Sequence, residues 1–161
     1  MPNTIKKGGK LYISSEDVSA DLLIAGYEAL TWVEVTGKVS FPEMGITTNM
    51  ASRDLLEDEV TSFQKGYSNA GQSDFEVAPD HDDLGQVELL EAGAPTYRFA
   101  RGFKIESNDK LNATGTNTIR YSRGQVAGPR LNSGGGEDFD TEVYTVAFEQ
   151  TPIIDKATAG A

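Results

Sequence analysis

Alternation between apolar and polar residues is the feature that most restricts the fold of this chain. The segment at 30–41, LTWVEVTGKVSF, places four apolar residues on one parity: Val33, Val35, Val39 and Phe41. A period of two with β-branched residues is typical of a strand that has one buried and one solvated face. We therefore predict a strand over 30–41 that ends at Pro42.

Shorter runs of the same kind recur along the chain. They predict further strands at 11–13, 60–65, 73–77, 96–106, 118–126 and 139–150. A turn is predicted at 66–71, polar loops at 107–117 and 132–138, and either a helical turn or a loop at 21–29. The chain has 17 Gly and 6 Pro, which favours many turns over long helices. The pattern predicts a mainly β protein, a β-sandwich or open barrel with one flanking α-helix.

The flanking helix is predicted at about 82–93. Asp82 or Asp83 can accept hydrogen bonds from its first turn, and Gly93 can end it. Its apolar residues lie on one side and make it amphipathic: Leu84, Val87 and Leu90, with Leu89 beside them.

Three segments lack the pattern of a core element. Residues 1–9 are predicted to be a flexible N-terminal arm and residues 155–161 a flexible tail, which leaves a single domain at 10–154. Residues 46–59, ITTNMASRDLLEDE, resemble neither a strand nor a stable helix, and we expect a long polar loop. Leu55 and Leu56 interrupt a charged run there, so their side chains would lie in solvent unless something covers them.

The charge balance limits the possible partners. The chain has 14 Lys and Arg against 25 Asp and Glu, a formal net charge of −11, which disfavours binding to DNA phosphates. Between Arg98 and Arg130, however, seven basic residues face only two acidic ones. This basic segment is either incidental or one of two complementary faces through which the protein binds copies of itself.

No residue constellation in the sequence predicts catalysis, a cofactor or a metal site. The chain has no Cys and one His, His81, which lies in an acidic turn and is expected at the surface. The stretch from Asp80 to Glu91 partly matches a calcium loop, but Leu84 occupies a ligand position, so an acidic helix start is the better interpretation. Aromatic and basic residues at 97–103 could suggest a nucleic-acid-binding sheet, but the aromatic residues share the apolar parity and are expected in the core.

No apolar run approaches the roughly 20 residues of a membrane span, and none follows the basic N-terminus as in a signal peptide. We therefore expect a soluble protein that is made in the cytoplasm.

Taken in order, several segments resemble the major tail proteins, or tail tube proteins, of long-tailed bacteriophages. The matching segments are VEVTGKV at 33–39, SFQKG at 62–66, FEV at 75–77, DLGQVELLEA at 83–92, YRFARGFKI at 97–105, YSRGQV at 121–126 and the closing strand at 139–150. The string at 83–92 is similar to the family's Asp-x-Gly-Gln helix. The resemblance covers roughly residues 10–154, without the C-terminal immunoglobulin-like domain of some relatives.

The resemblance implies a structural virion protein without enzymatic activity or cofactor. Six subunits would form a ring, and the rings would stack into a hollow tube that delivers the genome. The loop at 46–59 would reach the neighbouring ring through its contact residues: Arg53, Asp54, Leu55 and Leu56. Expected partners are other copies, the tail terminator, the tape measure and the baseplate or tip proteins, with DNA passing through the lumen without specific binding.

The resemblance leaves open which machine is meant, because similar tubes occur in contractile tails, gene transfer agents and type VI secretion systems. The tube would be assembled in the cytoplasm of the bacterial host. A monomeric or small-oligomeric β-sandwich binding module, of the adhesin or carbohydrate-binding type, is the alternative that the strand pattern also allows.

Overall fold

The computed structural model describes residues 7–57 and 59–160. In chain order the elements are β1 (Lys10–Asp17), α1 (Ile24–Glu28), β2 (Trp32–Val35), β3 (Thr47–Arg53), β4 (Ser62–Asn69), β5 (Gln72–Val77), α2 (Leu84–Ala92), β6 (Arg101–Glu106), β7 (Ile119–Leu131), β8 (Glu142–Phe148) and β9 (Ile153–Asp155). No helix in these two ranges is long and apolar enough to cross a bilayer.

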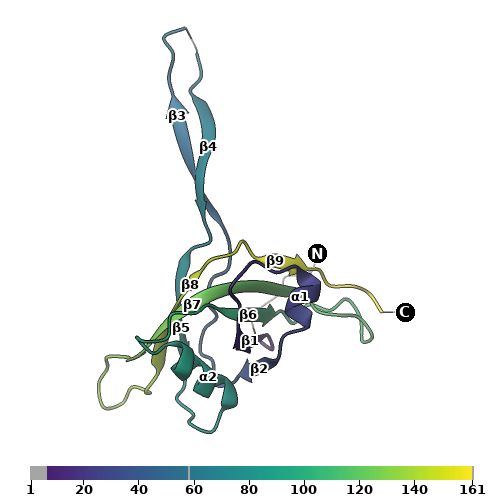
Figure 1. The fold of residues 1–161 in the computed structure, drawn as a ribbon, viewed down its shortest axis with the longest axis vertical. Coiled ribbons are helices and arrows are strands. Elements are labelled where there is room, and N and C mark those ends of the chain that lie inside the picture. The colour runs from purple at the N-terminus through teal and green to yellow at the C-terminus, as the bar shows by residue number, and fades with distance from the viewer. Residues whose placement is uncertain (1–6, 58, 161) are drawn as a thin grey trace.

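Seven strands form one antiparallel sheet, the body of the molecule. Its strand order is β2-β1-β6-β7-β8-β5, and β9 pairs with β7. After β2 the chain turns at Gly37, where φ is 70°, and Lys38 forms an antiparallel bridge with Val77 of β5. This bridge links the two ends of the strand order, so the sheet curls into an open barrel (Figure 1). The predicted fold class, mainly β with a flanking helix, is confirmed.

The concave side of the sheet holds the main core. Phe75 and Tyr144 stack there, and Phe103 meets Phe148 edge-on with ring centroids 5.9 Å apart. Smaller side chains fill the remaining space: Leu11, Ile13, Val35, Val77, Val126 and Val146. These buried residues alternate with more exposed ones along β5 and β8, as a period of two predicts.

A second, smaller cluster lies on the outer face of the sheet, under α1. Tyr27 of α1 is fully buried and stacks on Tyr121 of β7, with ring centroids 5.3 Å apart. Burial raises the pKa of Tyr27 to about 12. The helical turn allowed for at 21–29 therefore exists, and it covers the outer face.

Three neighbouring residues attach α2 to the sheet. Asp83 caps the helix by accepting a hydrogen bond from the Gln86 amide (3.0 Å), and it also accepts one from the Thr36 hydroxyl (2.7 Å). Gly85 lies against the backbone of Glu34, which leaves no room for a Cβ atom. The Gln86 side chain donates to two carbonyl oxygens, those of Thr36 and Ala78, and accepts from the Asp80 amide. The residues of the Asp-x-Gly-Gln string thus hold this helix against the sheet.

A buried arginine fastens α2 from the other side. The Arg101 side chain is 4% exposed and forms ion pairs with Glu88 and Glu91 of α2 and with Asp17 of β1. It also donates hydrogen bonds to the Tyr97 hydroxyl (2.7 Å) and the Ser14 carbonyl (3.0 Å). Since every charge here has a partner, the guanidinium group can be buried without an unpaired charge.

The predicted helix at 82–93 is confirmed, but its side that faces the core differs from the predicted one. The buried residues of α2 are Gly85, Gln86, Leu89 and Ala92, whereas Leu84, Val87 and Leu90 are 70%, 45% and 52% exposed. The reason is that Gly85 allows close approach and Gln86 is needed for hydrogen bonds with two loops, so this polar side turns inward.

The predicted strand at 30–41 ends early, at Val35. Gly37 breaks the alternation, and Val39 is 59% exposed although it shares the parity of Val35. The prediction of strands at 60–65 and 73–77 around a turn at 66–71 also needs correction. β4 continues through Gly66 to Asn69, the turn shrinks to the residues around Gly71, and β5 pairs with β8 instead of β4.

The structure describes part of each end of the chain that was predicted to be flexible. In the C-terminal tail, Asp155 belongs to β9, and Thr158 bridges Thr116 through backbone and hydroxyl hydrogen bonds. The tail at 155–160 is therefore paired with the body. At the N-terminus, residues 1–6 of the predicted arm at 1–9 lie outside the described residues, and residues 7–9 lead directly into β1.

Candidate functional site

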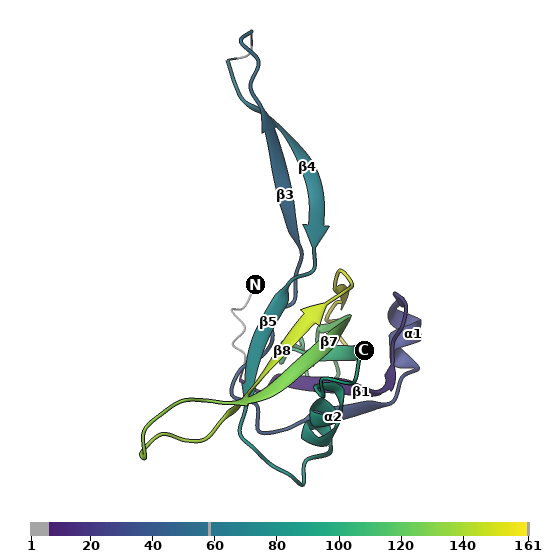
Figure 2. The same ribbon diagram turned by 60° about the vertical axis from the view of Figure 1, so that its left-hand side comes forward.

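A long β-hairpin, β3 with β4 and the connection between them, projects from the body (Figures 1 and 2). We call residues 46–69 the arm. Its strands form a separate two-stranded sheet that does not join the main one. Every residue of β4 and every residue of β3 except Thr48 is exposed. The expected polar loop at 46–59 is therefore wrong for β3, because β4 supplies the pairing partner that the isolated sequence pattern did not reveal.

The two sides of the arm differ in polarity. On one side Met50 lies opposite Lys65 and Ser52 lies opposite Phe63. Met50 is 55% exposed and Phe63 is 65% exposed. The opposite side carries small or polar residues, and a bulge between Thr48 and Met50 separates this region from the base of the arm. The arm is thus amphipathic without a core of its own.

The predicted contact residues lie at the distal end of the arm. Arg53 is the last residue of β3, where it pairs with Ser62, and Asp54, Leu55 and Leu56 follow it. Leu55 is 44% exposed and Leu56 is fully exposed. Arg53 therefore ends a strand, and Asp54, Leu55 and Leu56 lie in the loop that connects β3 to β4.

Charge is distributed unevenly along the arm. The two strands contain one Arg and one Lys, Arg53 and Lys65, and no acidic residue. The connection at 54–61 contains four acidic residues and no basic one. We call β3 and β4 the shaft of the arm and the connection at 54–61 its tip. The shaft therefore carries only positive charge and the tip only negative charge, a pattern that can orient a partner more than it can strengthen binding.

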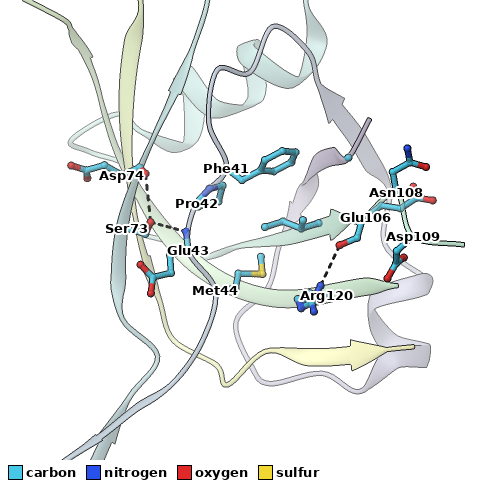
Figure 3. Close-up of a pocket in the computed structure, with 13 residues that line it drawn as sticks. Phe41, Pro42, Glu43, Met44, Ser73, Asp74, Glu106, Asn108, Asp109 and Arg120 are labelled. Atoms are coloured by element: carbon cyan, nitrogen blue, oxygen red, sulfur yellow. Dashed lines mark hydrogen bonds between the residues drawn. The ribbon is translucent and has the colours of Figure 1, made fainter. Parts of the chain in front are cut away.

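An open groove of about 770 Å³ lies at the base of the arm (Figure 3). Its apolar floor includes Phe41, Met44 and Ile105, and its rim carries several acidic groups: Glu43, Asp74, Glu106 and Asp109. Arg120 is the one Lys or Arg among its lining residues, and it donates a hydrogen bond to the Ser107 hydroxyl (3.2 Å). The Ser73 hydroxyl accepts a hydrogen bond from the Glu43 amide (2.7 Å), which holds the chain leading to the arm against β5.

One carboxylate of this groove has a perturbed acidity. Asp109 accepts hydrogen bonds from the Thr118 amide (2.8 Å) and the Thr118 hydroxyl (2.7 Å). These bonds lower the pKa of Asp109, and nearby Arg120 lowers it further. The ionised carboxylate therefore holds the two ends of the loop between β6 and β7 together.

The acidic residues that the structure describes are not grouped as in a metal centre. In residues 7–57 and 59–160 no group of three or more His, Asp or Glu side chains is arranged to hold a metal ion. In the calcium-like stretch from Asp80, Asp83 caps α2 and Glu91 pairs with Arg101. His81 lies exposed in the turn before α2, as expected.

The outer face of the sheet presents a cation between two aromatic rings. The Lys104 ammonium group lies 4.2 Å from the ring centroid of Tyr12 and 5.2 Å from that of Trp32. Burial lowers the pKa of Lys104. In the candidate nucleic-acid segment at 97–103, Phe103 lies in the core as expected and Arg101 is buried. The expectation is wrong for Phe99, which is 61% exposed.

Three of the seven basic residues in the segment at 98–130 form ion pairs within the chain. Arg101 is bound as described above, Arg123 pairs with Asp21 and Glu149, and Arg130 pairs with Asp74. The complementary-face interpretation therefore loses three of its seven cations to partners within the same chain.

No protein family model matches the chain, and no curated protein matches it.

Two exposed apolar surfaces were not predicted from the sequence. Met50, Phe63 and Tyr67 of the arm are exposed, and so is the outer side of α2. Residues 60–69 contain no acidic residue, which by itself does not indicate an exposed apolar side. Phe63 and Tyr67, four residues apart in an otherwise polar strand, are the pattern that could have indicated it.

Proposed function

We propose that this protein is a structural subunit that assembles into hexameric rings, which stack into the hollow tail tube of a long-tailed phage for genome delivery. The proposal includes no enzymatic activity and no cofactor. Its site is the distal end of the arm, where Arg53, at the end of β3, and Asp54, Leu55 and Leu56, in the connection, would contact the next ring. The protein would reside in the tail of the virion after assembly in the host cytoplasm.

The projecting arm is the observation that carries this proposal. A two-stranded hairpin alone in water is marginally stable, and this one exposes both faces, both edges and several apolar side chains. Such a hairpin gains most when another molecule covers it. An arm that points away from its own body is suited to reach a neighbouring subunit (Figure 2).

The charge of the chain supports passage of DNA through such a tube without specific binding. A net charge of −11 opposes retention of phosphate, because the release of counterions that drives DNA binding requires many cationic contacts. Three arginines of the basic segment are already paired within the body. The tape measure, tail terminator and baseplate or tip proteins would be the further partners.

Light scattering coupled to size exclusion, followed by negative-stain microscopy over a range of protein and salt concentrations, tests the proposal. Rings with six subunits or stacked tubes are the expected result. A matched chain in which residues 47–69 are replaced by a short Gly-Ser turn should keep its melting transition and remain monomeric. A wild-type chain that stays monomeric at every protein and salt concentration tested would contradict the proposal.

The groove at the base of the arm favours a second candidate, a β-sandwich binding module of the carbohydrate type. Its floor combines Phe41 and Met44 with polar groups such as Asn108 and Asp109 on the rim. A glycan array with the wild type and with Phe41→Ser tests this alternative. Glycan binding by the wild type alone, together with a monomeric state, would favour the binding module over the tube subunit.

A further inference from the structure

The outer side of α2 is an exposed apolar stripe. Leu84, Val87 and Leu90 are spaced three residues apart and are 70%, 45% and 52% exposed, while the other side of the same helix is packed on the sheet. Single exposed apolar residues are ordinary, but three on one side of a nine-residue helix mark a contact surface.

The stripe borders a hollow of about 180 Å³. Val87 and Leu90 line it together with Tyr144, whose ring belongs to the core, and the acidic residues Asp80 and Glu142 lie at its rim. The segment 80–92 contains five acidic residues and neither Lys nor Arg. A partner for this surface should therefore present apolar side chains beside a positive charge.

The shaft of the arm has these properties. Met50 and Phe63 lie on the same side as Lys65, and no acidic residue occurs in either strand. Met50 and Phe63 are 55% and 65% exposed, so this side of the shaft has no cover within the chain. The arm and α2 thus complement each other in polarity and in charge.

The arm of one molecule cannot lie on its own α2. In both views the arm extends from one end of the long axis and α2 lies at the other end of the body (Figures 1 and 2). A contact between them must therefore join two copies head to tail. In such a heterologous contact each copy still has one free arm and one free α2, so further copies can add. This is the geometry of rings and open stacks.

We infer that the outer side of α2 is the docking surface for the arm shaft of a second copy of this chain, with Phe63 and Met50 against Val87 and Leu90. The inference rests on the proposed self-assembly and specifies its receiving surface. It is separate from the tip contact, because it uses the shaft of the arm.

Disulfide trapping tests this pairing, because the chain has no Cys of its own. Full-length Phe63→Cys and Val87→Cys chains are mixed at assembling concentration and oxidised. We expect a crosslinked dimer that contains one chain of each kind. The control mixes Phe63→Cys with Leu23→Cys, a position that is 79% exposed and lies beside α1. This pair should yield at least about tenfold less heterodimer if the docking is specific.

The second measurement uses a variant in which the exposed stripe of α2 is made polar. The triple variant Leu84→Ser, Val87→Ser and Leu90→Ser should raise the critical concentration for assembly at least about tenfold, because three apolar contacts are lost. The variant Leu84→Met, Val87→Ile and Leu90→Met keeps the stripe apolar and should assemble like the wild type. Circular dichroism checks that both variants fold.

The outcomes separate this inference from the proposed function. Tubes that form normally with the polar stripe and without the specific crosslink would overturn the inference and leave the proposed function standing. The specific crosslink in head-to-tail oligomers that never become tubes would support the inference and overturn the tube. A wild type with neither assembly nor crosslink would overturn both.

Discussion

The body and the arm are both antiparallel β-structure, yet they are stabilised in different ways. In the body, β5 and β8 pair along their length, and each places one side on the core through residues such as Phe75 and Tyr144. In the arm, β3 and β4 also pair along their length, but no side of either strand is buried. The backbone hydrogen bonds are alike, and the difference lies in the apolar area removed from water.

This difference shows which part of the molecule is complete in itself. Hydrogen bonds contribute little net stability when water is the alternative partner, whereas burial of apolar area is the dominant favourable term. The body therefore buries the apolar area that a folded domain needs. The arm lacks it and can acquire it from another copy, which is the basis of the proposed assembly.

One substitution made in both regions tests the comparison most severely. Phe103→Ala in the body should lower the free energy of unfolding by about 3–5 kcal/mol, because Phe103 is fully buried against Phe148. Phe63→Ala in the arm should change it by less than about 0.5 kcal/mol, since that ring is already largely in water. Urea unfolding of the two monomers measures both values. Similar losses at the two sites would show that the arm folds onto the body.

A glycine pair gives the next largest contrast. Gly85→Ala should destabilise the monomer by about 1–3 kcal/mol, because the added Cβ would overlap the Glu34 carbonyl and lie 2.6 Å from the Val35 Cα. Gly45→Ala, just before the arm, meets no atom within 4 Å and should be neutral or slightly stabilising. Thermal unfolding of the two variants measures the difference. An unchanged transition in Gly85→Ala would mean that α2 is not held closely against β2.

The sequence predicted the body better than the arm, and the reason is physical. Alternation reports the burial of one side of a strand, so 73–77 and 118–126 could be recognised from their own residues. β3 buries nothing and therefore leaves no such pattern in TTNMASR. Its strand form comes from pairing with β4, which a local pattern does not report.

The helix shows a different limit. Its ends could be predicted because Asp83 and Gly93 act locally. The side that faces the core could not, because Gly85 and Gln86 turn inward for contacts with β2 and two loops that are distant in the sequence. The sequence indicates that Leu55 and Leu56 are exposed, because two leucines in a charged run have no local cover. It does not indicate that Leu84, Val87 and Leu90 of α2 are exposed, because their spacing is also that of a core-facing side.

A smaller effect is expected at Asp109, which staples a loop of the body. The hydrogen bonds from Thr118 depress its pKa, so the ionised form stabilises the fold above the unfolded value of about pH 4. Asp109→Asn should therefore lower stability at pH 7 by less than about 1 kcal/mol, since solvent screens this partly exposed group. The difference from the wild type should vanish as the pH falls through the depressed pKa.

Urea unfolding at pH 7 and pH 3 measures this change. The control is Asp54→Asn, which makes the same change of charge at the tip of the arm, away from the Thr118 staple. It should leave monomer stability nearly unchanged at both values of pH. A loss in Asp109→Asn that persists equally at low pH would show that the carboxylate acts through packing and not through its charge.

The smallest effect on the monomer, and the largest on assembly, is expected at the tip of the arm. Leu55 and Leu56 are 44% and 108% exposed, and leaving such side chains in water forfeits roughly 1.5–3 kcal/mol each relative to burial. Replacing both by Ser should leave the melting temperature of the monomer nearly unchanged, because no buried contact is lost. Tube formation should be abolished or greatly slowed, because the loss repeats at all contacts of the proposed ring. A destabilised monomer would place the leucines in the core of the subunit, whereas normal tubes would show that the tip makes no contact that assembly needs.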